Sequence, residues 1–116
     1  MIITRADSGD DWTCLIRRGM LHSDTESVEH WNLAAGRTLD LAGLGVDETL
    51  IVLTGACTLD GRSMGPGSAA FAAERTGGLL TAEEPSTVLS VRTYAARASK
   101  ALPPRVPELP ENERAL

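Results

Sequence analysis

Apolar residues along this chain fall in short runs, which Gly, Asp and Pro separate about every eight to twelve residues. Helical periodicity is weak, and this spacing is typical of an all-β sandwich or barrel. The predicted strands are Trp12–Arg17, Val28–Leu33, Thr38–Leu41, Thr49–Thr54, Ala56–Leu59, Ser68–Ala72, Gly78–Ala82 and Thr87–Tyr94. These strands are enough for two facing antiparallel sheets.

The most apolar run is Leu50–Leu53, which suits a strand that is buried on both faces or lies at a subunit contact. Asp60-Gly61 is a good hairpin signal. Met64–Gly67 breaks the chain again, because Pro fixes φ and Gly permits a positive φ. The hairpins are therefore expected to follow one another closely.

A chain of 116 residues has room for one modest core, so we expect a single domain over residues 1–102. Four of the six prolines lie between Pro103 and Pro110. Proline at this density removes backbone donors and favours extended chain, so residues 103–116 are expected to form a Pro-rich tail. The tail is expected either to be disordered or to lie as an arm across a partner subunit.

Charge excludes two classes of partner. The net charge is −5 and the pI is about 4.9, so neither a basic groove for nucleic acid nor a membrane-binding surface is expected. The first residues lack the pattern of a signal peptide, and no apolar run is long enough to span a membrane, which predicts a cytoplasmic protein. Cys14 and Cys57 are then expected to be small buried residues rather than a disulfide.

A more specific pattern begins at Gly36. Five residues later comes Ala42-Gly43-Leu44, three residues after that Glu48, and after six more Gly55. This frame resembles the first motif of the cupin superfamily, in which Gly is followed by His-x-His, then by Glu, then by Gly at these intervals. The spacing fits throughout, while both histidines are absent.

The second cupin motif runs Gly, five residues, Pro-x-Gly, two residues, His, three residues, Asn. Counting from Gly67 places Ala73-Glu74-Arg75 at Pro-x-Gly, Gly78 at the His and Ala82 at the Asn, so only the first Gly is retained. The resemblance covers roughly Val28 to Tyr94. It implies a cupin-type antiparallel β-barrel, or jelly roll.

In cupins the three histidines and the glutamate bind Fe, Mn, Ni or Zn. A site of this kind needs about three protein donors, and Ala42, Leu44 and Gly78 have no donor side chain. We call these three the lost-ligand positions. His22 and His30 both precede the first motif, and their spacing matches no compact ligand pattern. The sequence therefore predicts no metal and no other cofactor.

One hypothesis is a metal-independent enzyme that holds a small organic substrate in the barrel. The resemblance implies the stand-alone cyclases, isomerases and dehydratases of bacterial specialised metabolism, none of which would use redox chemistry here. Glu48 is the candidate catalytic acid or base, since the motif frame points it into an apolar barrel. The candidate binding residues are Arg92, Tyr94, Cys57, Arg75, Leu44 and Trp31.

The alternative is a non-catalytic module that binds a small ligand or serves as a dimeric scaffold. Small apolar residues at the lost-ligand positions suit a filled core or a dry pocket. A buried and ion-paired Glu48 would favour the structural role, and a Glu48 open to a cavity would favour chemistry. Under either hypothesis we expect a homodimer, because Leu50–Leu53 and the Pro-rich tail offer more association surface than a small barrel needs.

Overall fold

The computed structural model describes residues 1–18, 20, 24–43, 45–96 and 100, and all statements below concern these residues. They form an all-β structure. Its strands are β1 (Trp12–Arg17), β2 (Thr25–Leu33), β3 (Thr38–Asp40), β4 (Val46–Thr54), β5 (Cys57–Leu59), β6 (Arg62–Met64), β7 (Ala69–Ala72), β8 (Leu79–Ala82) and β9 (Ser86–Tyr94).

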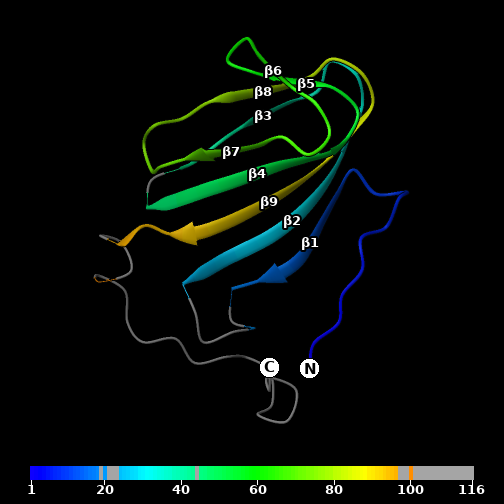
Figure 1. The fold of residues 1–116 in the computed structure, drawn as a ribbon. Coiled ribbons are helices and arrows are strands. Elements are labelled where there is room, and N and C mark those ends of the chain that lie inside the picture. The colour runs from blue at the N-terminus through cyan, green and yellow to red at the C-terminus, as the bar shows by residue number, and fades with distance from the viewer. Residues whose placement is uncertain (19, 21–23, 44, 97–99, 101–116) are drawn as a thin grey trace.

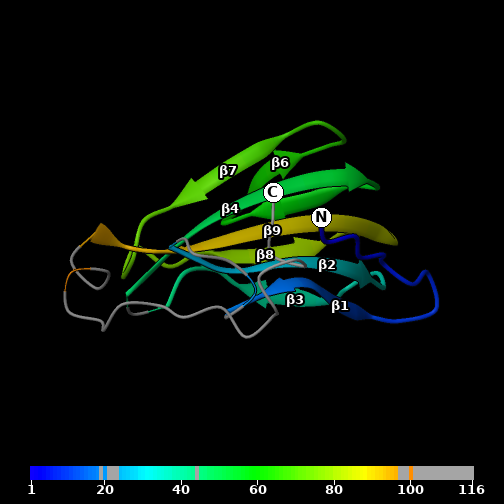
Figure 2. The ribbon, with the colours of Figure 1, turned by 90° about the horizontal axis from the view of Figure 1, so that it is seen from below.

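The strands form two antiparallel sheets. The larger has the order β1-β2-β9-β4-β7 and the smaller the order β3-β8-β5-β6, so the chain crosses repeatedly from one sheet to the other. Figure 1 shows the five strands of the larger sheet side by side, with the smaller sheet gathered beyond β4 and β7. Figure 2 shows the same strands from below, with β7 and β1 at opposite borders of the larger sheet.

Alternation along the strands defines the core between the sheets. Leu50 and Val52 of β4, Val88 of β9 and Leu80 of β8 have no exposed surface. Burying a side chain of this size contributes about 1.5–3 kcal/mol. Further buried members are Leu33, Leu41, Cys57, Met64, Ala72 and Ala82. The core is therefore built from the inward-facing positions of both sheets.

The expected all-β class and the two sheets are confirmed, with differences at particular strands. The strand β6 was not predicted, because Arg62 and Ser63 are exposed and only Met64 is apolar and buried. β4 is buried on one face only: Leu50 is buried, whereas Leu53, at a register shift, is 43% exposed. The interpretation that this run is buried on both faces is therefore wrong.

The turn after β4 requires glycine. Gly55 has φ +90°, and a Cβ added there would lie 2.2 Å from Ser86 Oγ and 2.6 Å from the carbonyl oxygen of Pro85. The same Ser86 hydroxyl contacts the backbone of Ala56. Gly55 therefore allows the β4–β5 turn to pack closely on the start of β9.

The remaining predictions concern the cysteines, membrane-spanning segments and the C-terminal tail. Cys14 and Cys57 are free thiols on different sheets, and Cys57 is part of the core. Within the described residues, no helix is both long and apolar enough to cross a membrane. The predicted tail, 103–116, lies outside the described residues, as do Leu44 and His22.

Candidate functional site

The glutamate of the first motif lies inside the barrel. Glu48 is on β4, is 7% exposed, and is flanked by β7 on one side and β9 on the other. Its Oε1 accepts a hydrogen bond from the backbone N–H of Ala42 at 2.8 Å, and its Oε2 accepts one from the Ser90 hydroxyl at 2.5 Å. Both carboxylate oxygens are thus bound to neutral donors.

The loop between β3 and β4 supplies the first of these donors. Ala42 has φ +51°, in the left-handed region that is costly for a residue with a Cβ. This conformation turns its N–H toward Glu48. At the position where a metal-binding cupin has its first histidine, the chain therefore offers a backbone hydrogen-bond donor to the retained glutamate.

The backbone geometry also agrees with the alignment to the second cupin motif. Arg75 has φ +66° at the position where the cupin motif has Gly, which supports the alignment made by counting. Gly78, at the histidine position, is partly buried, and a Cβ there would be 3.4 Å from Leu59 Cδ1, 3.6 Å from Asp60 Oδ2 and 3.8 Å from Leu41 Cδ1. Two leucines and one carboxylate thus surround this position.

The residues present do not fit the metal that the fold implies. Ala42 and Gly78 have no donor side chain, and both oxygens of Glu48 already accept hydrogen bonds. In the part of the chain that the structure describes, no group of three His, Cys, Asp or Glu side chains could hold a metal ion. His30 alternates with the inward-facing Glu29 and so lies on the outer face of β2.

A second buried carboxylate lies on β2, which β9 separates from β4. Glu29 is 8% exposed. Its Oε1 accepts a hydrogen bond from Trp12 Nε1 at 2.6 Å, and its Oε2 accepts one from Ser27 Oγ at 2.9 Å. The Arg92 guanidinium lies 3.9 Å away, measured from Nη1 to Glu29 Oε2. We call Trp12, Ser27, Glu29 and Arg92 the interior polar cluster; Trp12, on the edge strand β1, is itself 47% exposed.

Two side chains on or next to β1, Cys14 and Arg18, have raised pKa values. Burial, followed by the charge of Glu29, raises the pKa of the Cys14 thiol on β1. Arg18 forms a two-point ion pair with Glu26, which raises the pKa of its guanidinium, and its guanidinium carbon lies 5.5 Å from the ring centre of Tyr94. Tyr94 thus has one cation over its ring.

The structure brings some predicted site residues together. Glu48 and Arg92 are Cα partners on β4 and β9. Trp31 is half-buried, packs against the core, and has its ring centre 6.1 Å from that of Trp12. Tyr94 lies at the end of β9, on the same face as Arg92.

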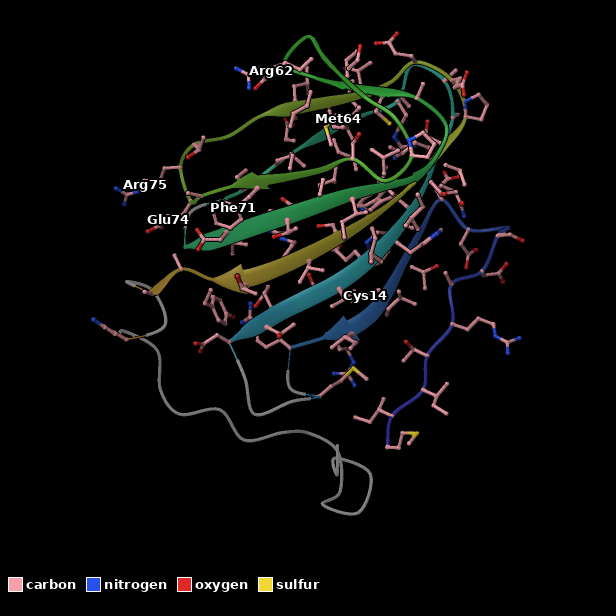
Figure 3. The ribbon with its side chains drawn as sticks, viewed as in Figure 1. Cys14, Arg62, Met64, Phe71, Glu74 and Arg75 are labelled. Atoms are coloured by element: carbon pink, nitrogen blue, oxygen red, sulfur yellow. The ribbon has the colours of Figure 1, made fainter. Side chains whose placement is uncertain are left out.

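Two other predicted residues lie elsewhere. Cys57 is 2% exposed and packs in the core from β5. Arg75 is exposed in the turn between β7 and β8, and Figure 3 shows its side chain pointing away from the sheets. Leu44 lies outside the described residues, so its place in the site stays a prediction.

Sequence reasoning missed Glu29, Ser27, Ser90 and Trp12. The alternation Ser27, Glu29, Trp31, Leu33 along one face of β2 carried the signal, because a buried Leu33 implies that Glu29 faces inward too. The predicted strand, Val28–Leu33, omitted only Ser27 of this face and already contained Glu29, so the inward position of Glu29 could have been inferred from it.

Two surface cavities lined by described residues lie away from Glu48 and the interior polar cluster. One, of about 560 Å³, opens beside the edge strands β6 and β7, with Arg62, Met64 and Phe71 among its lining residues (Figure 3). Another, of about 440 Å³, is lined by residues that include Asp11 and Asn32. None of the predicted site residues lines either of them.

Comparisons with known proteins address the fold. Neither a family model nor a curated protein sequence matches the chain. Among solved structures, a Cupin 2 conserved barrel domain protein from Salinispora arenicola CNS-205 matches with TM-score 0.65 and 18% identity, over 88% of this chain and 98% of that one. KdgF from Halomonas sp. matches with TM-score 0.60 and 19% identity, over 88% and 94%.

A regulatory protein provides a third match. The Cupin_2 domain of an XRE family transcriptional regulator from Enterobacter cloacae has TM-score 0.58 and 19% identity, over 72% of this chain and 95% of that one. The chain therefore has the cupin fold, an antiparallel β-barrel of the jelly-roll type, as its first motif led us to expect.

Proposed function

We propose that this chain is a metal-independent cupin-fold protein that binds a small organic molecule inside its barrel. The observation that carries the proposal is the interior polar cluster, in which Glu29 and Arg92 lie on the inner face of the larger sheet. Buried charges destabilise a fold unless a partner or a ligand compensates them. An interior with only a structural role would be more stable with apolar residues at these positions.

The surroundings of the cluster suit a ligand of modest size. The lost-ligand positions Ala42 and Gly78 carry no bulky side chain, and Leu59, Asp60 and Leu41 lie within 4 Å of the Cβ position of Gly78. Trp31 offers an aromatic face next to Trp12. In this proposal Arg92 binds the polar part of the ligand, and Trp31 packs against its apolar part.

A second candidate function is a non-redox enzyme, such as a cyclase, isomerase or dehydratase. The observation that favours it is the presence of two buried carboxylates, Glu29 and Glu48, with Ser90 on the strand between them. Ser90 is the Cα partner of Glu29, and its hydroxyl group donates a hydrogen bond to Glu48. Glu48 would act as the acid or base by exchanging one of its two hydrogen bonds for a bond to the substrate. Under this function Glu48→Gln abolishes turnover and leaves binding largely intact.

The test is a screen of small organic molecules against the purified protein. Binding is read from thermal unfolding and from the fluorescence of Trp12 and Trp31, with and without EDTA. We expect at least one class of compound to raise the unfolding temperature equally in both conditions. Binding that EDTA abolishes, or a screen in which no compound changes either signal, contradicts the proposal.

A further inference from the structure

Two arginines near the end of β9 differ sharply in how their donors are used. Arg18 has a side chain that is 63% exposed, and it forms two charged hydrogen bonds with Glu26, at 3.0 Å from Nε and 2.6 Å from Nη2. Arg92 has a side chain that is only 34% exposed, yet its closest ion pair is at 3.9 Å. The more buried guanidinium is thus the less well satisfied one, which reverses the usual order.

The missing hydrogen bond of Arg92 is at one atom, its Nε. Its Nε is buried and has no hydrogen-bond partner within the described part of the chain. A guanidinium has five N–H donors and no acceptor atom, so this N–H can only be satisfied by an acceptor. A buried donor without an acceptor is destabilising, so this position needs an acceptor that the chain does not provide.

The two nearby carboxylates do not fill that role. Glu29 accepts from Trp12 Nε1 at 2.6 Å and from Ser27 Oγ at 2.9 Å, and only its more distant contact is with Arg92. Glu48 is the Cα partner of Arg92, but its oxygens accept from Ala42 and Ser90. The neutral donors thus occupy both acids and leave the Nε–H of Arg92 without an acceptor.

We propose that the molecule bound in the barrel carries a carboxylate group, and that Arg92 binds this group through Nε and a terminal nitrogen. This inference rests on the proposed function and specifies its ligand class. The planar guanidinium presents parallel N–H donors at the spacing of two carboxylate oxygens. The buried Glu29 and Glu48 favour the single charge of a carboxylate over the double charge of a phosphate, which they would repel more strongly.

The test compares acetate, succinate and benzoate with the amide of each acid. The Arg Nε–H resonances are followed by NMR in protein labelled with ¹⁵N, together with the indole N–H resonances of Trp12 and Trp31. We expect the carboxylates, and not the amides, to shift the Nε–H resonance of Arg92. Losing the charge-assisted pair in Arg92→Gln should weaken carboxylate binding about 10- to 100-fold.

Two variants control the experiment. Arg37→Gln removes a guanidinium whose ion pair is with Asp11, and it should leave carboxylate affinity unchanged. Arg92→Lys keeps the charge but loses the two-point geometry, so it should bind with intermediate affinity even if Arg92→Gln folds poorly. Each variant is checked for an unchanged backbone spectrum before titration.

The outcomes distinguish a failure of the carboxylate inference from a failure of the proposed binding function. If the amides bind as tightly as the acids, or if Arg92→Lys and Arg92→Gln leave affinity unchanged, the carboxylate inference is overturned and the binding function stands. If none of the six probes moves the Arg92 or indole resonances, the carboxylate inference is overturned too. The binding function fails with it only when the wider screen also finds no ligand.

Discussion

Glu48 and Arg92 face each other as Cα partners on β4 and β9, yet their side chains form no ion pair with each other. Glu48 binds the N–H of Ala42 and the hydroxyl of Ser90, and Arg92 lies nearest to Glu29. Opposite charges on paired strands usually attract. Here local donors reach Glu48 first, so the carboxylate ties the β3–β4 loop to the larger sheet.

The stability of Glu48 variants tests whether these two hydrogen bonds stabilise the fold. In Glu48→Gln the amide oxygen can still accept from Ala42 and the amide nitrogen can donate to Ser90, so we expect a loss of about 1 kcal/mol in the free energy of unfolding. Glu48→Ala leaves both buried donors unpaired and should lose about 3 kcal/mol. Urea unfolding measures both. Equal losses in the two variants would contradict the hydrogen-bonded role.

The turn at Gly55 predicts a larger steric effect. Gly55→Ala would place a Cβ 2.2 Å from Ser86 Oγ at a positive φ, so we expect a loss of about 3 kcal/mol or more in the free energy of unfolding. Gly61→Ala is the matched control, because φ is +83° and no atom lies within 4 Å. It should lose only about 1 kcal/mol from backbone strain. Urea unfolding that ranked the two variants in the opposite order would contradict the close packing.

The raised pKa of Cys14 predicts a reactivity and a pH dependence. Burial and Glu29 favour the neutral thiol, so iodoacetamide should label Cys14 in the folded Cys57→Ser variant at a higher pH than in the same chain in urea. The pKa of the Cys14 thiol is higher in the folded chain than in the unfolded chain. Its contribution to the free energy of unfolding is therefore fully present below the pKa of the unfolded chain, and it is lost as the pH rises through the pKa of the folded chain.

The raised pKa of Cys14 also predicts how the stability of the fold depends on pH. The free energy of unfolding should fall more steeply with alkaline pH in the parent chain than in Cys14→Ser, which lacks the thiol. Urea titrations on both sides of the ordinary thiol pKa measure this difference. Identical pH profiles for the two proteins would show that Cys14 is not held in its neutral form.

The lost-ligand positions predict that the protein purifies without a stoichiometric transition metal. Ala42 and Gly78 offer no ligand, and both oxygens of Glu48 accept hydrogen bonds. Adding Zn²⁺, Ni²⁺ or Mn²⁺ should leave the unfolding temperature unchanged, since a metal that bound only the folded chain would raise it. Elemental analysis decides the matter, and one equivalent of bound metal would count against the prediction.

Self-association remains a prediction, for which the outer face of the larger sheet is our proposed surface. Ile51 pairs there with Leu89 of β9, and Leu53 is 43% exposed. We expect a homodimer, with Leu53→Lys shifting it to monomer. Leu79→Lys is the matched control, because Leu79 is also 43% exposed but lies on the smaller sheet. Sedimentation measures the mass, and a monomeric parent chain at micromolar concentration would contradict the prediction.

The sequence alone was enough to predict the all-β class and most of the strands. Short apolar runs with Gly, Asp and Pro between them, and the Asp60-Gly61 turn, are local properties that the backbone geometry of a strand or hairpin requires. The Gly36 and Gly55 spacing was informative for the same reason, since both have positive φ. The weakest local signal, the polar β6, was the strand that was missed.

Only the tertiary structure decided how the interior side chains are paired. Glu48 and Arg92 were both predicted site residues, but no pattern indicated that the nearest acid to Arg92 would be Glu29. The bond from Trp12 to Glu29 spans 17 positions in the chain, and the bond from Ser90 to Glu48 spans 42. Such pairs depend on strand register and on which donor a neighbouring strand or loop brings within reach, and these are settled only when the strands of the larger sheet pair.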